Sequence, residues 1–233
     1  MKVKPIQAFS DNYIWVIEDK KEVVIVDPGE AEGVLDDLEG IMPQAVTILL
    51  THNHDDHIGG VEEIVARYPD TVVYGPVETE ELNDVTVKDG DSFEINKRAF
   101  DVFKTAGHSK EHISYLVDEH LFCGDALFSG GCGRVFTGDY QAQFDALQTF
   151  NQLPGRVKIY AGHEYTETNL RFAHSIDPSN ERASAALDEV ISIRGEGLPT
   201  LPSTIDRERQ INVFLQAETL EEFVELRKAR DQF

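Results

Sequence analysis

Residues 45–57, AVTILLTHNHDDH, place an apolar run directly before three histidines and two aspartates. A short apolar run with β-branched side chains predicts a buried strand. In an extended chain, residues i and i+2 point to the same side, so His52 and His54 can converge on one ion, while Asp56 and His57 follow at the turn. A solvated polar loop is the alternative interpretation. The density of ligand-type side chains behind a buried strand favours a metal site.

The same arrangement recurs three times further along the chain. β-rich runs lead into His108, Asp125 and His163, each after a glycine or a small residue. Ligands at strand ends, on loops held by a rigid scaffold, are a common way for α/β proteins to build sites. The seven side chains fit two first-row ions of borderline softness, with imidazoles on each ion and one carboxylate able to bridge both.

The order of predicted elements divides the chain into a β-rich part and a helical part. Short β-rich runs alternate with helix-like segments at 31–39, 60–68 and 140–152, and this order suggests sheets covered by helices. After about residue 165 the strand signals fade, and helices are predicted at 168–176, 182–193 and 219–233. We therefore expect a catalytic domain at 1–165 and a small helical domain at 166–233.

Composition excludes several classes of partner. The net charge of −22, from 43 acids against 21 bases, argues against nucleic acid or an anionic membrane as a partner, since each requires a basic face. No run approaches the ~20 apolar residues of a membrane span, and the first residues lack the apolar core of a secretory signal. Two cysteines without a CxxC motif fit a reducing compartment. We expect a cytoplasmic protein that acts as a monomer.

Four motifs together resemble a known family. THNHDDH, GHSKEHISY, FCGDALF and AGHEYT are similar to the metal-binding motifs of the metallo-β-lactamase superfamily. GCGR, GHEYT and the closing LRKARDQF narrow the resemblance to glyoxalase II, the hydroxyacylglutathione hydrolases, over essentially the whole chain. The fold implied is α+β, a four-layer αββα sandwich followed by a small helical C-terminal domain.

The resemblance also implies a role for each ligand-type residue. His52, His54 and His108 would hold the first metal, Asp56, His57 and His163 the second, and Asp125 would bridge them. Zinc is the expected ion, with iron and manganese as alternatives that imidazole and carboxylate also suit. The nucleophile implied is a metal-bound hydroxide, with Asp56 and Asp125 as the catalytic carboxylates. Asp27, in VDPG, matches a position that orients a ligand histidine, although a turn-forming role explains it equally well.

The substrate implied is a glutathione thioester, S-D-lactoylglutathione, hydrolysed to D-lactate and glutathione. A thioester expels a thiolate whose parent thiol has a pKa of about 8.5, so a general acid is dispensable. Resemblance assigns Arg134, Tyr165, Arg227 and Arg230 to the glutathione moiety; the alternative is that the basic residues of the last helix complement its dipole. Phe136 stands where the family often has an aromatic hydroxyl, which places glutathione affinity in question.

Two other functions compete with this interpretation. One is a glutathione persulfide dioxygenase of the same superfamily with a mononuclear iron site. The other is a non-hydrolytic diiron redox or sensing module, in which relatives often replace the second histidine of the first motif by glutamate; here that position holds His54. Cys132 has no suitably placed base and is expected to be structural. His112, His120 and His174 are expected to serve structural or surface roles.

Overall fold

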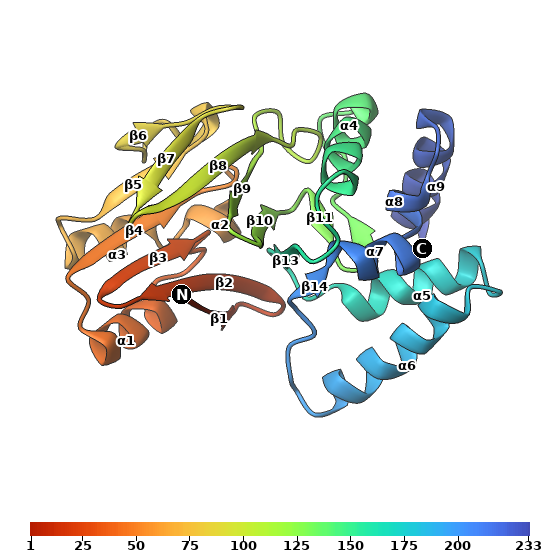
Figure 1. Ribbon diagram of the computed structural model, residues 1–233, viewed down its shortest axis with the longest axis horizontal. Coiled ribbons are helices and arrows are strands. Elements are labelled where there is room, and N and C mark those ends of the chain that lie inside the picture. The colour runs from red at the N-terminus through yellow and green to blue at the C-terminus, as the bar shows by residue number, and fades with distance from the viewer. The chain divides into compact units, whose positions relative to one another are not determined.

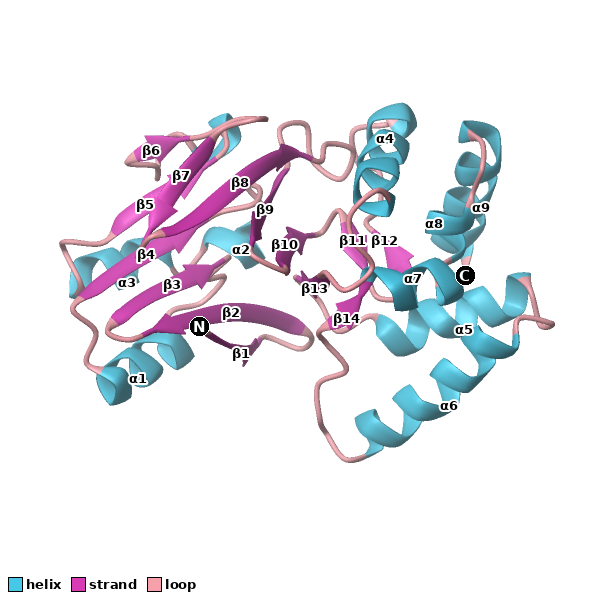
Figure 2. Ribbon diagram, viewed as in Figure 1, coloured by secondary structure: helices cyan, strands magenta, loops and turns pink.

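The computed structural model describes residues 1–233 as two compact units, whose elements are traced in Figures 1 and 2. The first unit comprises Met1–Lys104 and Glu111–Asp118. The second comprises Thr105–Lys110 and Glu119–Phe233. These units divide the chain elsewhere than at residue 165, and the domain boundary there stays a prediction.

A six-stranded sheet in the order β1-β2-β3-β4-β5-β6 forms the framework of the first unit. β1, β2 and β3 pair in antiparallel fashion, and β3 to β6 pair in parallel. The strands are β1 (Lys2–Ala8), β2 (Asn12–Asp19), β3 (Glu22–Val26), β4 (Ala45–Leu49), β5 (Val72–Gly75) and β6 (Val85–Thr86). β2, β3 and β4 are almost entirely buried, as expected for runs rich in valine and isoleucine.

Two helices cover one face of this sheet, α1 (Glu32–Ile41) and α3 (Val61–Arg67), as Figure 1 shows. Val34 and Leu38 of α1 and Val61 and Ile64 of α3 are at most 2% exposed, and they pack in one cluster with alternate residues of the strands. The period of two in a strand and the three-to-four spacing in a helix explain why these residues share one core. The short α2 (Asp55–Ile58) and the 3₁₀ turn η1 (Val77–Thr79) complete this part of the unit.

A three-stranded meander provides a second β layer within the first unit. It consists of β7 (Ser92–Ile95), β8 (Arg98–Lys104) and β9 (Ile113–Val117), paired in antiparallel fashion. The ring of Phe93 stacks on Tyr74 of the first sheet, with centroids 4.3 Å apart, and the Tyr115 hydroxyl donates to the carbonyl of Leu50 at 2.8 Å. These contacts hold the two β layers face to face.

Short strands and helices make up the second unit. Its strands are β10 (His120–Gly124), β13 (Lys158–Ala161) and β14 (Ser203–Thr204), with a separate hairpin of β11 (Leu127–Phe128) and β12 (Gly131–Cys132). β10 and β13 run parallel, whereas β14 is antiparallel to β13. The helices are α4 (Tyr140–Asn151), α5 (Thr166–Ile176), α6 (Glu181–Gly195), α7 (Ile205–Ile211), α8 (Val213–Gln216) and α9 (Leu220–Gln232). Leu170, Ala183, Ala186, Val190 and Ile211 form a core among α5, α6 and α7.

The predicted α+β class and the helical C-terminal region are confirmed. Several elements were missed, among them the four-residue β7. β1 contains Pro5, which lacks a donor for a sheet ladder but is tolerated here because β1 is an edge strand. α7, α8 and the two-residue strands are too short to give a periodic signal. None of the helices has both the length and the apolar character needed to cross a membrane.

Candidate metal centre

In the first unit, the ligand-type residues follow β4 directly. His52 is fully buried, His57 is 1% exposed, and His54 and Asp56 are more accessible. His54 stands at the N-cap of α2, and Asp55 and Asp56 lie in its first turn, where the helix dipole favours negative charge. The strand end and this turn place His52 Nε2 3.1 Å from His54 Nδ1. Two imidazole nitrogens on one tetrahedral zinc ion lie about 3.3 Å apart, given Zn–N bonds of ~2.0–2.1 Å.

Asp27 organises the histidines of this unit. Its Oδ1 accepts from the Thr51 N–H at 2.8 Å, and its Oδ2 accepts from Thr51 Oγ1 at 2.7 Å and faces His57 Nδ1 at 3.1 Å. Asp27, His52 and His57 are grouped closely enough to bind an ion themselves. Both carboxylate oxygens of Asp27 are nevertheless occupied by donors, so Asp27 orients ligands instead of serving as one.

The hydrogen bonds also fix which imidazole nitrogen carries the proton. Because a carboxylate only accepts, His57 must donate from Nδ1 to Asp27. The Thr51 hydroxyl gives its proton to Asp27, and therefore accepts from His52 Nδ1 at 2.9 Å. In a neutral ring, Nε2 of His52 and of His57 then keeps its lone pair, which is the state that a metal ligand requires.

Gly29 lies where the 27–29 turn and the backbone of Asp56 approach each other closely. A Cβ atom on Gly29 would lie 1.9 Å from the carbonyl oxygen of Asp56. Only glycine allows the 27–29 turn to pack against the loop that carries Asp56. Asp27 itself has φ +52°, an uncommon conformation for a residue other than glycine, which is held here by its hydrogen bonds to Thr51 and His57.

In the second unit, two parallel strands end beside each other. Gly124 at the end of β10 pairs with Ala161 at the end of β13, so Asp125 and His163 follow at the same edge. Asp125 Oδ2 lies 3.3 Å from His163 Nε2 and 3.4 Å from His108 Nε2. A single carboxylate oxygen therefore lies between two imidazole nitrogens, and all three residues are at most 5% exposed.

His108 is oriented by the segment that leads to Arg134. The carbonyl of Arg134 can only accept, so His108 donates to it from Nδ1 at 3.0 Å and keeps the lone pair on Nε2. A Cβ atom on Gly133 would lie 2.0 Å from the carbonyl oxygen of Asp125 and 3.0 Å from His108 Nδ1. The second glycine of GCGR is thus required by close packing around the two ligand-type residues.

Basic side chains gather around one carboxylate in the second unit. Asp231 lies 2.9 Å from Arg227 Nη2 and 3.3 Å from Arg134 Nε. Burial lowers the pKa of Arg230, the positive charges of Arg227 and Arg134 lower it further, and Asp231 partly offsets them. Three guanidinium groups around one carboxylate leave an excess of two positive charges, which suits an anionic ligand.

The four residues predicted to bind the substrate differ in how much of each is accessible. Arg134 is more than half exposed and Arg230 is half-buried. Arg227 is only 4% exposed, and its Nη1 donates to the Cys132 carbonyl at 2.7 Å. The ring of Tyr165 stacks on His163, with centroids 4.7 Å apart. The guanidinium of Arg134 lies 5.8 Å from the centre of the Phe136 ring, which is itself 62% exposed.

The cysteines and the remaining histidines have contacts of a structural kind. Burial raises the pKa of the Cys132 thiol, which keeps it protonated and unsuited to nucleophilic attack. Both cysteines are free and buried. His112 is fully buried beside His52, His120 Nδ1 lies 2.7 Å from the Tyr160 hydroxyl, and exposed His174 contacts Ser184.

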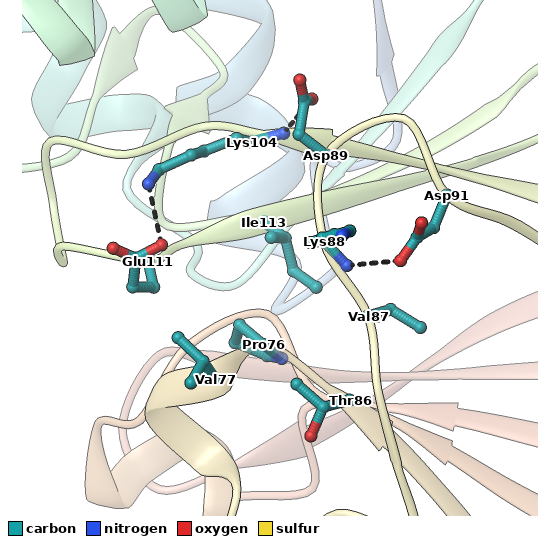
Figure 3. Close-up of a pocket in the computed structure, with 10 residues that line it drawn as sticks. All are labelled: Pro76, Val77, Thr86, Val87, Lys88, Asp89, Asp91, Lys104, Glu111 and Ile113. Carbon is teal, nitrogen blue, oxygen red and sulfur yellow. Dashed lines mark hydrogen bonds and ion pairs between the residues drawn. The ribbon is translucent and has the colours of Figure 1, made fainter.

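A pocket of about 400 Å³ lies elsewhere in the first unit (Figure 3). Its lining combines apolar side chains with charged ones, among them Lys88, Asp89 and Asp91. None of the predicted metal ligands lines it. Lys104 and Glu111, which form an ion pair of 2.7 Å in this pocket, flank the 105–110 segment that carries His108.

Two family models match separate parts of the chain. The model of the metallo-beta-lactamase superfamily matches residues 9–104, and the model of the hydroxyacylglutathione hydrolase C-terminus matches residues 164–233. The ETHE1 protein from Myxococcus xanthus has a similar fold, with a TM-score of 0.75 and 24% identity over 98% of this chain and 90% of that chain. The fold therefore defines a member of the metallo-β-lactamase superfamily.

Full-length relatives narrow the assignment. The chain is 50% identical to a hydroxyacylglutathione hydrolase of Glaesserella parasuis serovar 5 (strain SH0165) and 47% identical to one of Haemophilus ducreyi (strain 35000HP / ATCC 700724), over 100% of each chain. The chain belongs to the hydroxyacylglutathione hydrolase family, glyoxalase II. It is an enzyme, and its family supports a hydrolase over a persulfide dioxygenase or a diiron redox module. The fold and its histidine–aspartate groups indicate that it binds divalent metal.

Three residues that support the site were not found from the sequence. Thr51 links Asp27 to His52, Asn12 donates to Asp56, and buried Glu208 accepts from the turn that precedes Cys132. Asn12 and Glu208 have partners far away along the chain. The position of Thr51, a hydroxyl residue between a strand end and His52, gave a weak indication in the sequence that it supports the site.

Proposed function

We propose that the chain hydrolyses S-2-hydroxyacylglutathione thioesters, with S-D-lactoylglutathione as the substrate of methylglyoxal detoxification. The products are D-lactate and glutathione: water adds to the carbonyl carbon, the carbon–sulfur bond breaks, and the sulfur leaves as a thiolate that takes up a proton from solvent. The observation that carries the proposal is the position of Asp125 Oδ2 between two buried imidazole nitrogens. The full-length similarity to named hydroxyacylglutathione hydrolases supports the choice of substrate.

In the proposed centre, seven side chains would bind two metal ions. His52, His54 and His108 would hold the first ion, Asp56, His57 and His163 would hold the second, and Asp125 would contribute to both. The lone pairs left on Nε2 of His52, His57 and His108 by their Nδ1 hydrogen bonds support this set. We propose zinc for both positions, since imidazole and carboxylate ligands suit it; iron and manganese share that preference.

The side chains of this centre position and orient the reacting groups. When bound, two divalent ions supply a water of lowered pKa and polarise a carbonyl oxygen. Asp27 and Thr51 hold His52 and His57 in one tautomer, and the Arg134 carbonyl does the same for His108. A thiolate is a good leaving group, so no side chain has to protonate it. The protonated, buried thiol of Cys132 takes no part.

The basic cluster would receive the glutathione moiety. We propose that Arg134 and Arg230 contact its carboxylates and that Tyr165 contributes a hydroxyl. Arg227 adds positive charge, while its buried nitrogen atoms already serve Cys132 and Asp231. Its direct contact with substrate, as predicted from the sequence, stays a prediction. Phe136 presents an apolar ring at the place where the family often has an aromatic hydroxyl.

The same proposal covers the organisation of the protein. Residues 1–165 would carry the metal ligands and residues 166–233 the glutathione-binding helices. A cytoplasmic monomer agrees with two free cysteines and with a net charge of −22, which disfavours nucleic acid and anionic membrane as partners.

Release of thiol from S-D-lactoylglutathione by metal-replete protein tests the proposal directly. We expect turnover that a chelator abolishes and that added zinc restores, together with about two ions per chain by elemental analysis. A β-lactam and glutathione persulfide with oxygen serve as comparison substrates. Thioester hydrolysis no faster than the uncatalysed rate would refute the proposed function.

A further inference from the structure

A buried asparagine contacts the carboxylate of Asp56. Asn12 is 6% exposed, and its Nδ2 donates to Asp56 Oδ2 at 2.9 Å and to the carbonyl oxygen of the same residue at 3.3 Å. One amide group therefore holds both the side chain and the backbone of Asp56. The two residues are 44 positions apart in the sequence and both belong to the first unit.

The contact joins the buried Asn12 to the partly exposed side chain of Asp56. Asn12 is the first residue of β2, where it pairs with Ala8 of β1, and the other edge of β2 pairs with β3 from Trp15 onward. The Asp56 side chain is 42% exposed and belongs to the four-residue α2. An accessible aspartate can adopt several rotamers, and a fixed donor on Oδ2 selects one of them.

The backbone around Asp56 is held in the same way. The 27–29 turn approaches so closely that a Cβ on Gly29 would overlap the Asp56 carbonyl oxygen, which is also the second acceptor for Asn12. His57 follows directly and is oriented by Asp27. Asp27 and Asn12 thus restrain two successive residues, one through its imidazole and the other through its carboxylate.

We infer that Asn12 is a positioning residue for Asp56, which it presents as a ligand of the second metal ion. This inference rests on the proposed function, in which Asp56, His57 and His163 hold that ion. Groups that orient a metal ligand typically contribute 10–100-fold in metal affinity. Loss of the Asn12 amide should therefore weaken one metal position and leave the other unaffected, because His52 and His54 make no hydrogen bond to Asn12.

The test is zinc titration of the full-length protein against a competing chelator, comparing wild type with Asn12→Leu and Asn12→Ala. Leucine keeps most of the buried side-chain volume but has no hydrogen-bond donor. Alanine, which is smaller, shows whether an effect of leucine comes from overpacking instead of from the lost donor. We expect one class of site to weaken by about 10–100-fold and the other to change by less than about 3-fold. Far-ultraviolet circular dichroism and thermal melting confirm that each variant is folded, so the binding data are compared among folded proteins.

Asn83→Leu is the matched control. Asn83 is a half-buried asparagine of the first unit, and its amide donates to the Pro76 carbonyl at 2.8 Å, far along the chain from any ligand. It should leave both metal positions at wild-type affinity. Equal affinities in wild type and both Asn12 variants, or equal weakening of both positions, would overturn the inference. Failure of the wild type to bind two ions or to hydrolyse thioester would instead refute the proposed function.

Discussion

Glu208 offers the sharpest test of how the second unit is held together. Its side chain on α7 is fully buried and accepts from four groups: Ser129 Oγ at 2.8 Å, the Gly130 N–H at 2.7 Å, Asn212 Nδ2 at 3.3 Å, and Ser203 Oγ. These contacts fix the turn between β11 and β12, from which the chain continues to Arg134. Replacing this residue should therefore affect the stability of the whole unit.

Two substitutions separate hydrogen bonding from charge. Glu208→Ala removes both carboxylate oxygens. The Gly130 N–H, which can only donate, is then left buried without its acceptor. The hydroxyls of Ser129 and Ser203 lose the same carboxylate as their acceptor. Each buried donor left unsatisfied costs about 1–3 kcal/mol, and the buried charge that disappears offsets part of the total, so we expect a net loss of about 2–4 kcal/mol. Glu208→Gln can keep its oxygen on Gly130 and Asn212 and donate to the two serine hydroxyls, which rotate to accept. We expect it to lie within about 1 kcal/mol of wild type at neutral pH.

The pH dependence distinguishes the two effects. Burial raises the pKa of the Glu208 carboxyl in the folded protein above its usual value, although the four donors partly counteract burial. The unfolded chain has the ordinary pKa of about 4.3, so the folded state binds the proton more tightly. The stability contributed by this carboxyl is complete below the unfolded pKa and is lost as pH rises through the folded pKa. Glutamine does not titrate, so the stability of Glu208→Gln should improve relative to wild type as pH rises.

Urea unfolding of the metal-replete proteins between pH 5 and pH 8 measures these differences. The control is Glu221→Gln on the exposed first turn of α9, which should change the free energy of unfolding by less than about 0.5 kcal/mol. The reasoning fails if Glu208→Gln destabilises the protein as much as Glu208→Ala at pH 7. It also fails if the difference between Glu208→Gln and wild type is independent of pH.

Three further predictions concern the site and the scaffold. Asp125→Asn keeps the shape of the side chain but removes its charge, and thiol release should fall by at least 10–100-fold in folded protein; unchanged turnover would exclude the bridging role. Arg230→Met should raise KM for the glutathione thioester by about 10–100-fold and leave kcat nearly unchanged, because one charge-assisted hydrogen bond to the substrate is lost. The control is Arg171→Met at an exposed position, which should alter neither constant. Met42→Gly should raise the free energy of unfolding by about 0.5–1 kcal/mol, because Met42 caps α1 at φ +52° with 69% of its surface exposed; a loss of stability in urea unfolding would contradict this.

Local signals in the sequence were sufficient for much of the fold. The runs that became β2, β3, β4 and β10 are apolar and β-branched or aromatic, and α1 and α4 follow the expected spacing. Patterns of this kind depend on residues that are close in the sequence, so they can be recognised without knowledge of the fold. β1 was hidden by Pro5, and α7 and α8 by their length.

The sequence alone predicted which side chains would serve as ligands, because His52, His54, Asp125 and their counterparts follow closely after strands and belong to motifs that resemble those of one family. How those side chains are held became visible in the tertiary structure. Asn12 meets Asp56 across 44 residues, and Glu208 meets Gly130 across 78. Such contacts depend on the packing of distant segments, and packing leaves no periodic trace in the chain. The proton positions on His52, His57 and His108 follow from the same long-range contacts, and so does the burial of Arg227.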